Sequence, residues 1–114
     1  ANATLKVQVG HSSYFEDVMS EALWGFAEKV RDMLLVSMAL EFQGTREMKP
    51  MGRFSLSISG QVVGCSFPKV QGNVSTHMEI WLKSRVIERI SVSGKTPYKV
   101  AKEVEEILLD RGVI

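Results

Sequence analysis

The sequence predicts an α+β domain in which two amphipathic helices cover one face of a single antiparallel sheet. Three observations lead to this class. Apolar residues recur at helical spacing in two segments, one near each end of the chain. Between these segments, apolar and polar residues alternate in several short runs, which is the pattern of strands with one buried face. Glycine, proline and serine residues separate the runs, as hairpin turns and loops require.

The first third of the chain is expected to form a strand, a helix and the start of another strand. Residues 5–9 alternate between apolar and polar side chains and predict the first strand. A capping box begins at Ser13, and the apolar stripe that follows it has helical spacing up to about residue 34. Residues 35–42 alternate again, so we expect a strand to begin near Leu35.

Four more strands are predicted in the middle of the chain, each with apolar residues at every second position. A tight turn at Gly60 joins the first two strands, and a short turn at Ser84 joins the last two. Glu88 falls on the apolar side of the last strand, which predicts a β-bulge near it. The strands are expected at about residues 53–59, 62–67, 77–83 and 85–92, with loops at 44–52 and 69–74.

A second helix is expected to close the chain. Thr96 is a suitable N-cap, Pro97 suits the first helical position, and Gly112 suits the left-handed residue that follows a helix. The predicted order is therefore β-α-β-β-β-β-β-α. We expect one globular domain over residues 1–114, since no internal repeat or low-complexity segment divides the chain.

Composition limits the classes of function. The hydrophobic fraction of 45% and the charged fraction of 24% are typical of globular domains. No apolar run approaches the ~18 residues that cross a bilayer, so no membrane partner is expected. Cys65 is the only cysteine and allows no internal disulfide, so we expect an intracellular, cytoplasmic protein. One cysteine and two poorly spaced histidines do not make a zinc site, and we expect neither a metal nor a cofactor.

No residue is assigned a catalytic role. His11 has no neighbours that would complete a triad. Gly94, Lys95 and Thr96 lie between a strand and a helix, as in phosphate-binding loops, but position 89 holds Arg where that motif needs a glycine. A turn followed by a helix cap is the favoured interpretation. An enzyme stays open as an alternative, because folding can assemble acid–base groups from distant positions.

Charge is segregated along the chain. Residues 1–44 carry three basic and six acidic side chains, residues 45–99 carry nine and three, and residues 100–114 carry two and four. The positive segment coincides with the predicted central strands, whereas the acidic segments coincide with the helices. Because local fields steer charged partners, a polyanion is expected to meet the sheet and not the helices.

One face of the predicted sheet carries residue types that bind nucleic acid. Trp81 points away from the predicted core and shares its face with serines of the neighbouring strands. Arginine and lysine neutralise phosphates, and an aromatic ring stacks on an unpaired base. We therefore predict a non-enzymatic nucleic-acid-binding module with single-stranded nucleic acid as its partner, although an open polar face or a face buried between two copies would show the same pattern. The predicted site residues are Arg46, Lys49, Arg53, His77, Trp81, Lys83 and Arg89.

Trp24 supports an alternative function. It is predicted to lie opposite the apolar stripe of the first helix, beside Gly25, which weakens a helix by roughly 1 kcal/mol relative to alanine. A large aromatic side chain on an outer helical face indicates a protein contact, unless a loop covers it. The alternative is therefore a homo-oligomeric assembly or scaffold protein, with Trp24, Gly25 and strand edges at the subunit contacts.

Residues 85–112 resemble, in layout, the end of one repeat of the TATA-box-binding-protein family. In both, a strand leads through a glycine-containing turn into an amphipathic helix, and the overall order of one helix, several strands and one long helix is also similar. This chain differs in its long acidic first helix, its single copy and its lack of the paired phenylalanines that kink DNA. The resemblance implies a helix-backed, curved sheet whose concave face meets nucleic acid, and it assigns no role to single residues.

Overall fold

The computed structural model describes residues 13–40, 53–70, 73–74 and 76–114 of the chain. The predicted first strand at 5–9 and the predicted loop at 44–52 lie outside these residues. The elements, in chain order, are α1 (Ser13–Ser37), β1 (Phe54–Ile58), β2 (Gln61–Ser66), β3 (Lys69–Val70), β4 (Asn73–Val74), β5 (His77–Leu82), β6 (Arg85–Ser91) and α2 (Pro97–Asp110).

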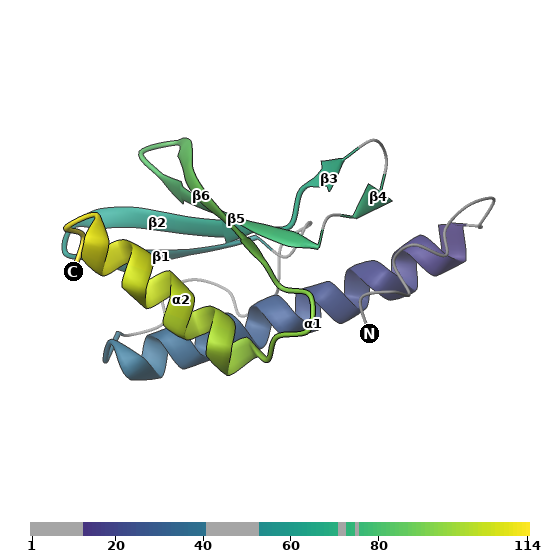
Figure 1. Ribbon diagram of the computed structural model, residues 1–114, viewed down its shortest axis with the longest axis horizontal. Coiled ribbons are helices and arrows are strands. Elements are labelled where there is room, and N and C mark those ends of the chain that lie inside the picture. Colours follow the sequence, from purple (N-terminus) through teal and green to yellow (C-terminus); the bar gives the residue numbers. More distant parts are fainter. Residues whose placement is uncertain (1–12, 41–52, 71–72, 75) are drawn as a thin grey trace.

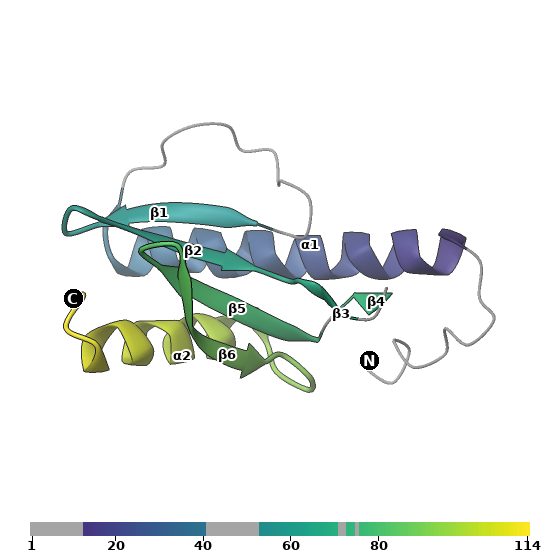
Figure 2. The ribbon, with the colours of Figure 1, turned by 90° about the horizontal axis from the view of Figure 1, so that it is seen from above.

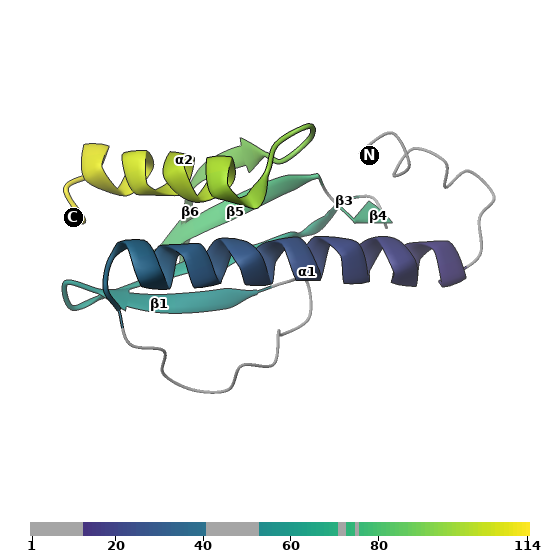
Figure 3. The same ribbon diagram turned by 90° about the horizontal axis from the view of Figure 1, so that it is seen from below.

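The fold has two layers, and the predicted α+β class is confirmed. Strands β1, β2, β5 and β6 form an antiparallel sheet in the order β1-β2-β5-β6, and β3 pairs with β4 in a separate short ribbon. Both helices lie side by side on one face of the four-stranded sheet (Figures 1 and 3). Within the described part of the chain, no helix lies on the opposite face (Figure 1).

The core lies between the sheet and the two helices. Strand β1 shows most clearly why the core lies there, because its side chains alternate between buried and exposed along its whole length. Its serines therefore face away from the helices, while its apolar side chains pack beneath the sheet. Phe67, just after β2, is fully buried and meets the Phe26 ring of α1 edge to face at 6.5 Å between centroids.

The strand expected to begin near Leu35 is wrong, because α1 continues to Ser37. The amide of Leu40 donates to the Leu35 carbonyl at 2.8 Å, and Ala39 has the left-handed φ of 53°. This is a Schellman ending in which alanine occupies the position that usually holds glycine. The Ser37 hydroxyl also donates to Glu105 Oε2 of α2 at 2.5 Å, a contact between helices that no local pattern reveals.

The middle of the chain follows the prediction with two additions. The predicted loop at 69–74 contains the short strands β3 and β4. The β-bulge expected near Glu88 is confirmed: Glu88 pairs with Ile80, whereas Trp81 pairs with Val86, which leaves Ile87 as the extra residue of β6.

Helix α2 begins and ends as predicted. The Thr96 side chain accepts a hydrogen bond from the Lys99 amide at 3.2 Å. At the other end, Gly112 has a φ of 75°, and the Val113 amide donates to the Leu108 carbonyl at 2.8 Å. The Arg111 guanidinium donates to the Ile87 carbonyl at 2.7 Å and so ties the helix end to the bulge of β6.

Neither helix, over the residues that the structure describes, is both long and apolar enough to cross a membrane.

Candidate nucleic-acid interface

The sheet face away from the helices is hollowed at one end. Figures 1 and 2 show the turn between β5 and β6 curling over β2 on this side of the sheet. Together with the turn between β1 and β2, it bounds a hollow of about 590 Å³. Residues of three strands and both turns contribute to its lining, including Arg53, Ser55, Gly60, Gln61, Val62, Gly64, Trp81, Lys83 and Ser84.

Both turns have the conformation that tight antiparallel hairpins need. Ser59 and Gly60 join β1 to β2 with φ values of 51° and 78°, and Lys83 and Ser84 join β5 to β6 with 53° and 63°. Two successive residues with positive φ are the mark of a type I′ turn, which usually contains glycine. The second turn has none, so the backbone is strained at two residues that line the hollow.

Trp81 is half-buried and held in place on this face. Its indole Nε1 donates to the hydroxyl of Ser66 at 3.1 Å, and Ser66 is itself buried on the neighbouring strand β2. The polar atom of the ring is therefore satisfied, and its orientation is fixed before any ligand arrives. A fixed aromatic ring at the edge of a hollow is a suitable surface for stacking a planar ligand.

Gly64 leaves space beside this ring. It pairs with Trp81 across β2 and β5 and with Ser55 across β1 and β2. A Cβ at position 64 would lie 3.5 Å from the Trp81 Cβ and 3.8 Å from the Ser55 Oγ. Any larger side chain here would therefore project into the hollow between the two.

Two of the predicted site residues supply positive charge to the lining of the hollow. Arg53 and Lys83 are both exposed and both line it. Among the residues for which the structure gives side chains, neither has an acidic partner. These charges are therefore available to an anionic ligand.

Arg89 is engaged in a different way. Its Nε lies 2.9 Å from Glu79 Oε2, and the two residues face each other across β5 and β6. Glu79 is only 8% exposed, so its carboxylate needs this partner. The pair cancels one of the positive charges that the sequence placed on this face.

The remaining predicted residues are not brought to the hollow by the described structure. His77 is exposed at the start of β5, opposite Ser91, at the far end of the strand from Lys83. Arg46 and Lys49 lie outside the described residues. The structure thus brings together Arg53, Trp81 and Lys83 from the predicted set.

Three residues of this site escaped the sequence argument, and of these Gly64 carried a local signal. Gly64 is a glycine inside a strand, which often marks a close approach of another group. Ser66 is buried and accepts from Trp81, and Glu79 faces Arg89 across the sheet. Their roles depend on register between strands, which the alternating pattern alone does not determine.

Trp24 lies nearer to the core than the sequence predicted. The buried stripe of α1 is formed by Leu23, Ala27, Val30 and Leu34, and Trp24 lies about 90° from its centre at 100° per residue. Trp24 and Gly25 are half-buried. Arg31 lies two helical turns after Trp24 on the same side of α1 and is 3% exposed. Its Nε donates to Asp32 Oδ1 at 3.1 Å. A role for Trp24 and Gly25 in subunit contacts stays a prediction.

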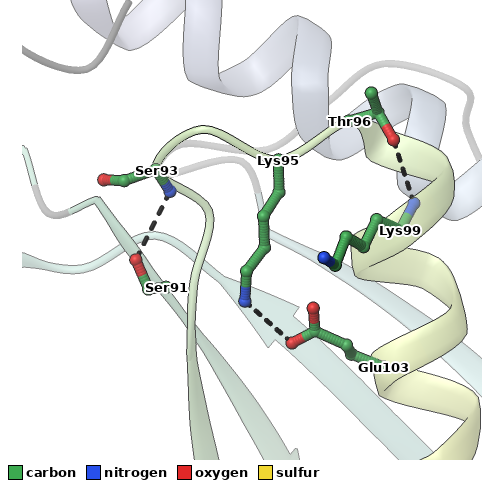
Figure 4. A network of polar contacts seen from close by, with 6 residues as sticks. All are labelled: Ser91, Ser93, Lys95, Thr96, Lys99 and Glu103. Carbon is green, nitrogen blue, oxygen red and sulfur yellow. Dashed lines mark hydrogen bonds and ion pairs between the residues drawn. The ribbon is translucent and has the colours of Figure 1, made fainter.

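The segment from Gly94 to Thr96 has a structural explanation. Lys95 Nζ lies 2.9 Å from Glu103 Oε1 of α2, and the Ser93 amide donates to the Ser91 hydroxyl at 3.4 Å (Figure 4). The lysine that a phosphate-binding loop would present is thus held by a carboxylate. These contacts fit the turn and helix cap favoured from the sequence.

The other chemical groups offer little to a ligand. Cys65 is buried on the core side, and burial raises the pKa of its thiol to about 12, so it stays neutral and unreactive. Within the described ranges, no three histidine, cysteine or acidic residues gather as metal ligands would.

Comparison of the chain with family models, curated proteins and solved structures found no match. The resemblance of residues 85–112 to a TATA-box-binding-protein repeat therefore stays a prediction.

Proposed function

We propose that the protein is a non-enzymatic nucleic-acid-binding module that uses the sheet face away from its helices. One observation carries the proposal: Trp81, Arg53 and Lys83 line the same hollow on that face. The aromatic ring suits the planar bases of a nucleic-acid strand, and the two cations suit its charged phosphates. Neither cation has an acidic partner in the described structure.

The ion pair across β5 and β6 restricts where a phosphate backbone can lie. The Glu79 carboxylate repels a phosphate, and the Arg89 guanidinium is already paired with that carboxylate. A polyanion therefore gains more from the β1 and β2 side of the face, where Arg53 lies, and from the turn that carries Lys83. Among the described residues, the contact with phosphate at the hollow thus falls to Arg53 and Lys83, and the contact with a base adds to it.

Salt dependence tests this proposal directly. Each phosphate contact with single-stranded nucleic acid contributes about −0.7 to the slope of log K against log salt concentration. Two contacts give a slope of about −1.4 for the wild type, and Lys83→Ala is expected to reduce it to about −0.7. Binding of fluorescent single-stranded RNA and DNA oligonucleotides, followed by anisotropy at several salt concentrations, measures both slopes.

Lys99→Ala is the matched control, because Lys99 is an exposed lysine on α2, on the other side of the molecule. It should leave both the affinity and the slope unchanged. Absence of binding by the wild type to RNA and DNA at low salt would refute the proposal. An equal effect of Lys99→Ala and Lys83→Ala would show that binding does not use this face.

A further inference from the structure

The hollow beside Trp81 has the dimensions of a binding site for a single small group. Its volume of about 590 Å³ lies within the range of about 300–1,000 Å³ that ligand sites in proteins occupy. It lies on the side of the sheet away from the helices, where the turn between β5 and β6 curls over β2 (Figures 1 and 2).

The floor of the hollow exists because position 64 has no side chain. Every other described residue of β2 places a side chain above or below the sheet, whereas Gly64 leaves the space between Ser55 and Trp81 unfilled. The φ of Gly64 is not in the left-handed region, and a Cβ would meet only ordinary contact distances. The backbone therefore does not require glycine here, and the space itself is what glycine provides.

The two cations lie on opposite sides of this space. Arg53 directly precedes Phe54, which pairs with Cys65, and Lys83 directly follows Leu82, which pairs with Val63, so the two cations lie beyond opposite neighbours of Gly64. A group seated over Gly64 thus has a positive charge on either side.

From this arrangement we infer that the hollow receives one unpaired base of a nucleic-acid strand, which lies against Trp81 while Arg53 and Lys83 bind phosphates on either side of it. The inference rests on the proposed function and adds selectivity for single strands. A duplex keeps the faces of its bases stacked inside and offers only edges and backbone. Only an unpaired base can bring a ring face to the indole.

Filling the hollow tests the inference without altering charge. Gly64→Val places a strand-forming side chain beside Trp81, and Ser57→Val is the matched control, because Ser57 lies on the same face of β1 but outside the lining of the hollow. Loss of stacking is expected to weaken binding of a single-stranded oligonucleotide between about 5-fold and 150-fold. Ser57→Val should bind as the wild type does.

Three further probes separate the inference from the proposed function. A duplex of the same sequence should bind more weakly than the single strand, and Gly64→Val should not change its affinity. A strand with abasic sites should bind the wild type as weakly as the intact strand binds Gly64→Val. Trp81→Leu, which keeps an apolar residue at this position, should reproduce the loss even where Gly64→Val disturbs folding, as judged by circular dichroism.

The outcomes distinguish the two ideas. Equal binding of single strand, duplex and abasic strand, with no effect of Gly64→Val, would overturn the base site and leave a nucleic-acid-binding face in place. A free mononucleotide that binds as tightly as the strand would also overturn it, because the flanking phosphates would then contribute nothing. Failure of all nucleic acids to bind would remove both.

Discussion

Replacing Ser84 by glycine is expected to stabilise the protein, because Ser84 has a φ of 63° in the turn between β5 and β6. A residue with a side chain pays roughly 1–2 kcal/mol in the left-handed region. Glycine avoids this cost but loses about 0.5–1 kcal/mol more conformational freedom on folding. The midpoints of the two ranges differ by about 0.75 kcal/mol, which is the expected net gain in the free energy of unfolding.

Thermal unfolding measures this gain. An unfolding entropy of about 2.1 cal/mol/K per residue, applied to 114 residues, converts it to a rise in Tm of about 2–4 °C. Ser57→Gly is the matched control: Ser57 is exposed in β1, where φ is not left-handed, and the same change should lower stability by about 0.5–1 kcal/mol. If Ser84→Gly destabilises the protein as Ser57→Gly does, the turn is not as described, and the placement of Lys83 at the hollow fails with it.

Two further predictions concern Cys65 and Trp24. Burial raises the pKa of the Cys65 thiol from 9.0 to about 12, so the stability that the neutral thiol contributes is complete below the pKa of the unfolded chain and is lost as the pH rises towards about 12. The difference in unfolding free energy between wild type and Cys65→Ala should therefore shrink above pH 9. A thiol reagent at pH 8 should label only unfolded protein. If Trp24 lies at a subunit contact, light scattering should show a defined oligomer that Trp24→Ala weakens, whereas a monomer at high concentration would contradict the assembly hypothesis.

The central strands could be predicted because one face of the sheet packs on the helices and the other face is open. In β1, each apolar side chain faces the helices and each serine faces the open side, so burial follows the alternation of the sequence directly. The bulge could also be predicted, since Glu88 interrupts that alternation and an extra residue at Ile87 restores it. Both features depend on local order along the chain, and local order is what a sequence pattern records.

The end of α1 could not be predicted for the opposite reason. Residues 35–40 alternate as a strand would, yet burial of Leu35 in the core and the bond from Ser37 to Glu105 hold them in a helix and its cap. Those partners are 68 residues apart in the chain. The usual marker of a helix end was also missing, because Ala39 occupies the left-handed position that glycine normally takes.

The hollow changes what the charge of the sheet segment means. Residues 45–99 carry nine basic and three acidic side chains, but Lys95 is held by Glu103 and Arg89 by Glu79. Among the described residues, Arg53 and Lys83 are the basic residues that line the hollow. Two phosphate contacts give a weak dependence on salt, far below that of proteins with 6–10 such contacts, which lose about 10³–10⁵ in affinity between 50 and 200 mM salt. Binding through this face must therefore rely on the base against Trp81 as much as on charge. That division explains why a glycine at position 64, which contributes no charge and no hydrogen bond from a side chain, should matter to affinity as much as a lysine does.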